Sequence, residues 1–494
     1  MLALGMCASV AIFAFVDAAL IKPLPYRNPT RLVNAFETVE GRPSALSYPD
    51  YLDWKKLNSV FSSFDAYRHS PFSLTTPSGV QKASGARVTD GFFRTLGVTP
   101  VLGRDFHPGE DLPAAPRTTL LSYATWQQRY GGKPDVLGRT VILNGDPVII
   151  IGVLPREFHF TPADPADFWT ALHAASECDL RRSCHSFSGI GRLKDGASVQ
   201  AALANLQSIA HQLEKLYPGS NRDQAAGAMP LSETIVGKIR PILLVLLTGA
   251  VLLLAISSVN VASLLLVRSE SRRREIAVRK ALGASAARLI SQFVTEGLVL
   301  VAAGSALGLA AAYGTMQLLV KLVPAGALAS MSYLEGVGMN MRVLVFAGAV
   351  SLLAAVLFSL TPAVHLSLVN AGNAFAARST GNTWRRLGSK LVVVELAIAM
   401  VLLVGAGLLG KSLYRLLSVE IGFEANRLVT LEVAAPRVSY ANDAQGHRPR
   451  AASRRSRPKP ARSEIRWPHD RHPDHFLGRY HVVPRSGPAL ARRT

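Results

Sequence analysis

The sequence predicts a membrane α-helical bundle of about five transmembrane helices, with one α/β (α+β) extracytoplasmic domain. Three observations lead to this fold class. Apolar residues, 49% of the 494 residues, gather in five long stretches. Basic residues gather in some of the short loops between these stretches. The long block 22–240 between the first two stretches instead carries the mixed patterns of strands and helices.

Each stretch is close to, or longer than, the roughly 20 apolar residues that a helix needs to cross a bilayer. A buried core helix can imitate one such stretch, but five of them indicate a membrane protein. The stretches run from Leu2 to Ile21, Pro241 to Val267, Phe293 to Val323, Val343 to Leu366 and Leu391 to Leu409.

These stretches divide the chain into six expected segments. They are a first membrane helix (1–21), an extracytoplasmic domain (22–240), a membrane domain with three helices and their cytoplasmic loops (241–390), a fifth membrane helix (391–411), the start of a second extracytoplasmic domain (412–440) and a basic tail (441–494).

Loop charges predict the orientation of the helices, because short basic loops stay in the cytoplasm. The loop from Arg268 to Arg288 has seven basic residues against Glu270 and Glu275. The loop after the fourth stretch is also basic, whereas Glu335 is the one charged residue of the loop 324–340. We therefore expect block 22–240 to face outward. The net charge of +21 then reflects membrane topology better than nucleic-acid binding, for which no module is recognisable.

The first stretch has two interpretations. A cleaved signal peptide is disfavoured, because the stretch has no basic lead and no clear small-residue cleavage site. We expect a retained helix, and the absence of a cytoplasmic lead-in suggests that the true start of the chain has been lost.

Local patterns predict the elements of the outer block. Asn144-Gly145 between two β-rich runs indicates a hairpin. Ser198 is placed to cap a helix whose apolar residues recur every three or four positions from Val199 to Leu213. Cys178 and Cys184 lie close together in this outward block, where a disulfide can persist. Two unpaired thiols remain the alternative.

The tail from Ala441 to Thr494 has 13 basic residues, 4 acidic residues and no hydrophobic periodicity. A disordered basic arm has this composition. A shifted reading frame or a truncated gene is the alternative that we favour, because an outward basic run has no role in membrane topology.

Two kinds of candidate site carry chemistry. The run Gly405-Ala406-Gly407-Leu408-Leu409-Gly410-Lys411-Ser412 matches the phosphate-binding loop pattern letter for letter, yet it closes an apolar helix without the required strand. Its glycines are better interpreted as helix-packing positions. The intramembrane acids Asp17, Glu296 and Glu395 are candidates for proton relay, but structural pairing near an interface is favoured for each. We expect no catalytic, cofactor or metal site.

The segments taken in order resemble the MacB/FtsX-like permease family, over about residues 2–440. The resemblance is carried by Leu2-Ala3-Leu4-Gly5, Val16-Asp17, Lys22-Pro23-Leu24-Pro25-Tyr26, Gly103-Arg104-Asp105-Phe106, Asn144-Gly145, Ile151-Gly152-Val153-Leu154-Pro155, Gly191-Arg192-Leu193-Lys194 and the segment Arg274 to Ser285. It implies that 22–240 is a MacB-like periplasmic core domain and that 241–390 is an FtsX-like domain. The chain is similar to a truncated member of a two-repeat subgroup.

The resemblance also implies a function. This chain would be a multi-pass permease subunit of an ABC transporter in the bacterial inner membrane, in contact with its lipid. A separate cytoplasmic ATPase would hydrolyse ATP, and the permease would pass the conformational change outward for efflux or export. The junction residues that would contact the ATPase are Arg274, Glu275, Arg279, Lys280, Ala281, Leu282, Gly283, Ala284 and Ser285.

Further partners follow from the same resemblance. We expect a dimer or pseudo-dimer, with a periplasmic adaptor as a further candidate partner and no nucleic acid. The alternatives are an FtsX-like transmembrane regulator of a periplasmic partner and a non-functional truncated permease.

Overall fold

A computed structural model describes residues 1–160, 162, 166–237, 239–271, 278, 286–322, 337–371, 380–418, 428–431 and 481–484. The chain divides into two compact units. The membrane unit comprises Met1–Lys22 and Val236–Glu420, and the extramembrane unit comprises Pro23–Ile235 and Ile421–Thr494.

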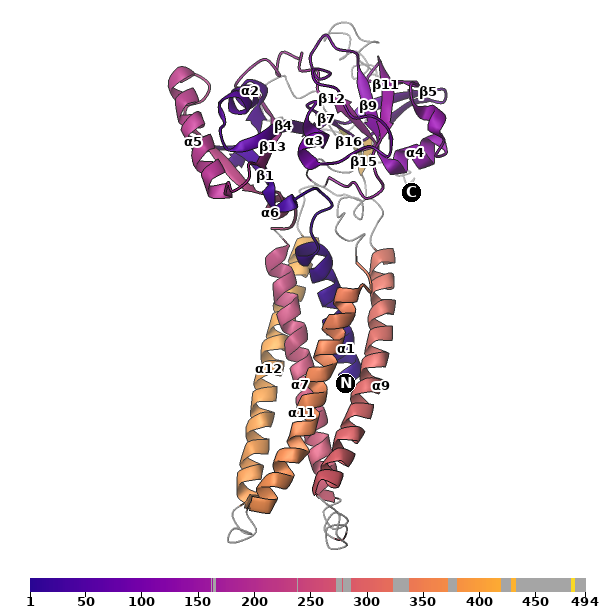
Figure 1. The fold of residues 1–494 in the computed structure, drawn as a ribbon, viewed down its shortest axis with the longest axis vertical. Coiled ribbons are helices and arrows are strands. Elements are labelled where there is room, and N and C mark those ends of the chain that lie inside the picture. The colour runs from indigo at the N-terminus through magenta and orange to yellow at the C-terminus, as the bar shows by residue number, and fades with distance from the viewer. Residues whose placement is uncertain are drawn as a thin grey trace, which may run out of the picture. The chain divides into compact units, whose positions relative to one another are not determined.

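Long apolar helices make up the membrane unit (Figure 1). They are α1 (Leu2–Val16), continued by the π-helical turn Asp17–Ile21, then α7 (Arg240–Ser271), α9 (Ala286–Leu322), α11 (Met341–Ala371) and α12 (Thr380–Leu417). Contacts join α1 to α7, α9 and α11, and join α12 to α7. The predicted helical bundle is therefore confirmed.

Four of these helices contain an apolar stretch long enough to cross a membrane, within the part of the chain that the structure describes. They are Leu2–Ile21, Arg240–Val261, Val294–Leu319 and Val392–Ser412. The fourth predicted stretch coincides with α11, where the described apolar segment Met341–Val356 is shorter. The five predicted stretches thus correspond to five helices, four of which satisfy the length criterion.

A mixed sheet dominates the extramembrane unit. Its strand order is β14-β1-β13-β4-β7-β12-β9-β11-β10-β5-β6, and β2, β3 and β8 pair off this path. Two neighbouring pairs, β11 with β9 and β12 with β7, are parallel, and the other described pairs are antiparallel. This arrangement confirms the predicted α/β class of the outer block.

The strands and helices of this unit have the following bounds. The strands are β1 Leu32–Val39, β2 Arg42–Ser44, β3 Leu46–Ser47, β4 Phe61–His69, β5 Phe72–Thr76, β6 Gly79–Ala83, β7 Gly85–Val88, β8 Leu102–Gly103, β9 Thr118–Leu121, β10 Thr140–Leu143, β11 Asp146–Val153, β12 Phe168–Ala171, β13 His185–Leu193 and β14 Gln224–Pro230. The helices are α2 Tyr48–Leu57, α3 Phe92–Leu96, α4 Tyr123–Tyr130, α5 Val199–Leu216 and α6 Leu231–Val236, with short 3-10 turns at Pro29–Arg31 and Pro134–Val136.

Local chemistry accounts for several of these boundaries. Asn144 and Gly145 have φ values of 54° and 89°, so both adopt the left-handed conformation that a tight hairpin between β10 and β11 requires. The Ser198 hydroxyl accepts a hydrogen bond from the amide of Ala201 and caps α5. The predicted hairpin and the predicted cap are both confirmed.

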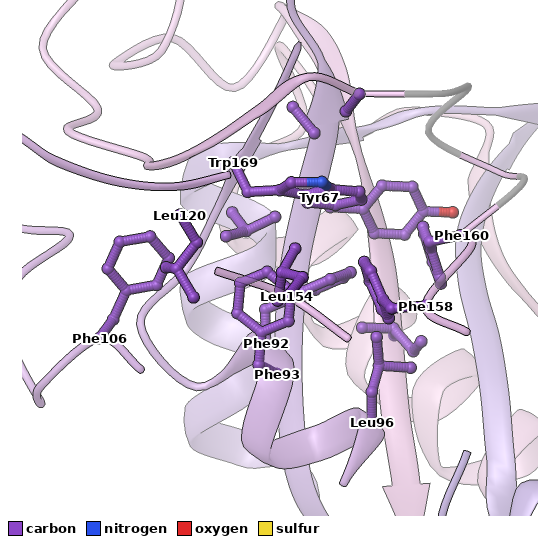
Figure 2. Close-up of a cluster of buried hydrophobic side chains, with 14 of the residues drawn as sticks. Tyr67, Phe92, Phe93, Leu96, Phe106, Leu120, Leu154, Phe158, Phe160 and Trp169 are labelled. Atoms are coloured by element: carbon purple, nitrogen blue, oxygen red, sulfur yellow. The ribbon is translucent and has the colours of Figure 1, made fainter. Parts of the chain in front are cut away.

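Aromatic side chains form the core at the centre of the sheet (Figure 2). Phe92 and Phe93 of α3 are fully buried and meet Trp169 of β12, with ring centroids 5.9 and 5.7 Å apart. Phe158 and Phe160 close the cluster edge-on. Such stacked and edge-to-face pairs stabilise a core beyond the burial of their area. α3 is therefore anchored in the core by its two aromatic side chains although it is only five residues long.

Of the tail, the structure describes one short strand. β16 (His481–Pro484) pairs antiparallel with β15 (Leu428–Leu431). The other residues of 441–494 lie outside the described residues, so the two interpretations of the tail stay predictions.

Candidate functional sites

α1 packs at the centre of the membrane unit. Leu2, Met6, Val10 and Ala14 are buried in one cluster with residues of α7, α9 and α11. Ring stacking of Phe13 on Phe346 of α11, with centroids 3.9 Å apart, continues this packing. This position is the one expected of a retained membrane helix.

Two glycines allow α1 and α9 to approach closely. A Cβ atom added to Gly304 would lie 2.7 Å from Leu2 Cδ2, and one added to Gly308 would lie 2.6 Å from Met6 Cβ. The same added atom at Gly308 would lie 3.0 Å from the carbonyl oxygen of Ala3. Small residues at such positions let two membrane helices pack backbone to backbone. α1 and α9 also run in the same direction, because Leu2 faces Gly304 and Met6 faces Gly308.

The contact of α1 with α7 is equally close. Gly5 faces Leu254, and the Ser9 hydroxyl donates to the carbonyl of Ala250 at 3.2 Å. Since a later residue of α1 meets an earlier residue of α7, these two helices are antiparallel. α1 is thus fixed on both sides by contacts that a larger side chain would break.

Asp17 is the one predicted intramembrane acid that the structure buries, with a side chain 1% exposed. Its Oδ2 accepts a hydrogen bond from Asn340 Nδ2 at 2.6 Å, and its Oδ1 lies 3.5 Å from Arg342 Nη1. Asn340 also caps α11, since its Oδ1 accepts from the amide of Val343 at 3.0 Å. The carboxylate therefore ties the last turns of α1 to the first turn of α11, which is structural pairing.

Glu296 and Glu395 are half-buried and belong to α9 and α12. Glu296 has an interaction partner within the chain. The parallel packing of α1 and α9 puts Asp17 and Glu296 roughly 35 Å apart along the bundle, at 1.5 Å per residue. The structure therefore does not bring these two acids together, and a direct relay between them is ruled out.

The phosphate-loop pattern from Gly405 to Ser412 lies inside the continuous helix α12. A phosphate-binding loop must come before a helix, so this run cannot form one. The interpretation as packing positions is not supported either. Nothing among the described residues lies within 4 Å of a Cβ atom added to Gly405, Gly407 or Gly410.

The proposed ATPase junction lies outside the described residues. This applies to Arg274, Glu275, Arg279, Lys280, Ala281, Leu282, Gly283, Ala284 and Ser285. The helices on either side are described, and α7 ends at Ser271 while α9 begins at Ala286. The role of the junction stays a prediction.

In the extramembrane unit, a disulfide joins Cys178 to Cys184. The loop that it closes carries two ion pairs. Asp179 pairs with Arg68 at 2.6 Å, and this contact lowers the pKa of the otherwise desolvated Asp179 carboxyl. Arg182 pairs with Asp50 of α2 at 2.5 Å. The loop is thus held to two different elements of the fold.

A second buried pair lies beside these charges. His185 Nδ1 lies 2.6 Å from Glu37 Oε2, and the Glu37 side chain is 3% exposed. Burial, with a smaller effect of Asp50, raises the pKa of Glu37 to about 7, although His185 opposes the shift. The hydrogen bond that the His185 ring makes to the Glu37 carboxylate raises the pKa of His185. Both groups of this pair therefore hold a proton to higher pH than an ordinary Glu or His side chain.

Comparison with known proteins gives two family matches. Residues 1–209 match the MacB-like periplasmic core domain, and residues 247–371 match the FtsX-like permease C-terminal domain. The chain belongs to the MacB/FtsX-like family of ABC transporter permeases.

Individual relatives of this permease are distant. The chain is 26% identical to the uncharacterized ABC transporter permease YknZ of Bacillus subtilis over 232 residues, 46% of this chain and 55% of that protein. It is 26% identical to the macrolide export ATP-binding/permease protein MacB of Escherichia coli K12 over 280 residues, 56% of this chain and 41% of that protein. The chain therefore spans about half the length of these relatives.

Two solved structures are also similar. The periplasmic region of MacB from Actinobacillus actinomycetemcomitans has 16% sequence identity and a TM-score of 0.32, covering 43% of this chain and 94% of that chain. The extracellular domain of YknZ from Gram-positive bacteria has 14% identity and a TM-score of 0.31, covering 40% of this chain and 99% of that chain.

Reasoning from the permease sequence missed the partners of Asp17. Asn340 and Arg342 were passed over because they lie at the edge of an apolar stretch. A signal for them exists, since Asn immediately before a long apolar run is a preferred helix cap. That Asn340 also donates to a carboxylate on another helix is visible only in the structure.

Proposed function

We propose that this chain is the permease subunit of an ABC transporter in the bacterial inner membrane. It works with a separate cytoplasmic ATPase and passes the conformational change of that ATPase to its extracytoplasmic unit, for efflux or export. The observation that carries the proposal is the close packing of α1 against α9 at Gly304 and Gly308.

This packing supports a route by which the conformational change would pass from α9 to α1. α9 begins directly after the predicted junction residues 274–285, so a push on the junction would reach α9 without an intervening element. α9 cannot slide past α1 without a clash, because Met6 and the Ala3 carbonyl lie against Gly308. α1 in turn is followed in the chain by the extramembrane unit, which starts at Pro23. Packed helices that shift together are a common element of such transitions.

The test is ATP turnover in a complex of the full chain with candidate cytoplasmic ATPases. We expect a stable complex whose turnover differs from that of the ATPase alone. Replacing Gly308 with Val overpacks the α1–α9 contact and should return turnover toward that of the isolated ATPase. Gly314→Val is the matched control on the same helix, since nothing lies within 4 Å of its added Cβ among the described residues.

Two outcomes count against this proposal. If no ATPase binds the chain, the division of labour between two subunits is wrong. If the complex forms but Gly308→Val and Gly314→Val behave alike, the route through α1 and α9 is wrong while the permease assignment stands.

A further inference from the structure

Three arginines lie close together in the extramembrane unit. Arg27 and Arg31 belong to the segment that follows the first membrane helix in the chain, and Arg192 lies on β13 opposite Leu32 of β1. Burial lowers the pKa of Arg192, and Arg31 and Arg27 lower it further. The pKa of a guanidinium falls in this way when other positive charges lie near it.

The Arg192 guanidinium is only partly satisfied. Its Nε donates to the carbonyl of Thr95 at 2.8 Å, and its Nη1 lies 3.4 Å from the carbonyl of Asn28. Its Nη2 is buried and has no hydrogen-bond partner. Buried donors in native proteins are normally paired, so the hydrogen bonds within the chain compensate the Arg192 guanidinium only in part.

Acidic groups do not balance the three cations. Arg31 donates to the carbonyl of Leu193 and to Asp195, whose side chain is 95% exposed. Arg27 is exposed, and no acid among the described residues pairs with it. The cluster therefore has an excess of positive charge beside an unsatisfied donor.

The position of Arg27 is built into the fold. Its amide donates to the carbonyl of Leu96 at 3.2 Å, and its Cβ packs over Gly97. Gly97 has a φ of 71°, and a Cβ atom there would lie 2.4 Å from that of Arg27. The glycine at the end of α3 thus leaves room for Arg27 beside the other two arginines.

We propose that Arg27, Arg31 and Arg192 bind a phosphate-type anion. Planar guanidinium groups donate paired hydrogen bonds to phosphate oxygens, and Arg27 and Arg31 present such groups at the surface while Arg192 adds its positive charge. The phosphate belongs either to an anionic lipid headgroup or to free phosphate, since the chemistry of recognition is the same. This site is independent of the proposed ATPase coupling and can be present whether or not that proposal holds.

The first test uses inorganic phosphate and the full chain in detergent, at constant ionic strength. We expect measurable binding by titration calorimetry, weakened about tenfold or more by Arg27→Gln, which removes a charge-assisted contact. Since the Arg27 guanidinium makes no hydrogen bond within the described residues, the variant should melt like the wild type without phosphate. Arg31→Gln should weaken binding as well.

Arg42→Gln is the matched control. Arg42 is exposed and pairs with Val39, at the opposite end of β1 from Leu32, so it carries the same charge far from the site. We expect its phosphate affinity to equal that of the wild type. Equal weakening by Arg42→Gln and Arg27→Gln means that phosphate responds to net charge alone, which overturns the proposal.

Lipid nanodiscs distinguish the two sources. If a headgroup is the ligand, phosphate affinity falls in discs of phosphatidylglycerol relative to phosphatidylcholine, and Arg27→Gln reduces the phosphatidylglycerol retained in native mass spectra. If free phosphate is the ligand, its affinity is the same in both discs and still depends on Arg27. Absence of phosphate binding in detergent, together with phosphatidylglycerol retention that does not depend on Arg27, refutes the site.

Discussion

Arg182 pairs with a fully buried carboxylate, that of Asp50, in the extramembrane unit. Its Nη1 lies 2.5 Å from Asp50 Oδ1, and the Asp50 side chain is 0% exposed. Its Nη2 lies 2.5 Å from Asp53, which is 30% exposed, and its Cζ lies 3.8 Å from the centre of the Tyr217 ring. Replacing Arg182 with Met keeps most of the apolar contact with the ring and removes the positive charge.

The expected loss follows from the burial of Asp50. Removing one partner of a buried ion pair typically costs about 3–5 kcal/mol, because the remaining charge is left without compensation. Ser47 and Asn221 still donate to Asp50, at 2.5 and 3.0 Å, so the lower end of this range is expected. Asp53 reaches water, and its contact contributes about 1 kcal/mol or less.

The measurement is urea unfolding of residues 23–235, produced as a secreted and oxidised domain. Arg182→Met should lower the free energy of unfolding by about 3 kcal/mol. Asp53→Asn is the control and should lower it by about 1 kcal/mol or less. Adding Asp50→Asn to Arg182→Met should restore part of the loss, since no buried charge is then stranded. A loss below about 1 kcal/mol for Arg182→Met, or no rescue by Asp50→Asn, would refute this reasoning.

Two further predictions concern the same unit. Replacing Cys178 and Cys184 with Ser opens a loop with a sequence separation of 6. The unfolding free energy should fall by about 2 kcal/mol from chain entropy, and reduction of the wild type should give the same loss; an unchanged midpoint in urea would contradict it. Glu37 has its pKa raised by burial to about 7 and His185 has its pKa raised by Glu37, so the folded state holds protons more tightly than the unfolded state. Stability from this pair is therefore present below the ordinary Glu pKa of about 4.5 and is lost as pH rises through about 7, the pKa of folded Glu37. The variant Glu37→Gln/His185→Gln should flatten that slope in urea titrations at several pH values.

Much of the fold was accessible from the sequence because its signals are local. A membrane helix requires only a long apolar run, and the five runs correspond to α1, α7, α9, α11 and α12. The hairpin at Asn144 depends on two residues that tolerate positive φ, and the cap at Ser198 depends on one hydroxyl. Each of these features is determined within a few residues of chain, so tertiary context had little to change.

Contacts between distant residues could not be predicted in this way. Asp17 was recognised as an acid in an apolar stretch, but its pairing with Asn340 joins residues 323 positions apart. The packing role of the glycines from Gly405 to Gly410 stays a prediction for the same reason. Glycines in an apolar helix are typical of helix packing, yet α12 presents these to no described neighbour. Spacing defines a face of a helix, whereas the fold decides what that face meets.

The glycines of α9, unlike those of α12, do meet another helix. Gly304 and Gly308 are four residues apart, whereas Gly405, Gly407 and Gly410 of α12 are two and three residues apart. α1 lies against the α9 pair with its backbone within about a van der Waals contact. The Asp17 carboxylate then fixes the far end of α1 to α11. α1 is therefore held at both ends by contacts of different kinds, one steric and one electrostatic. We expect a helix held in this way to move as a unit with its neighbours, which is the property that the proposed transmission along the bundle requires.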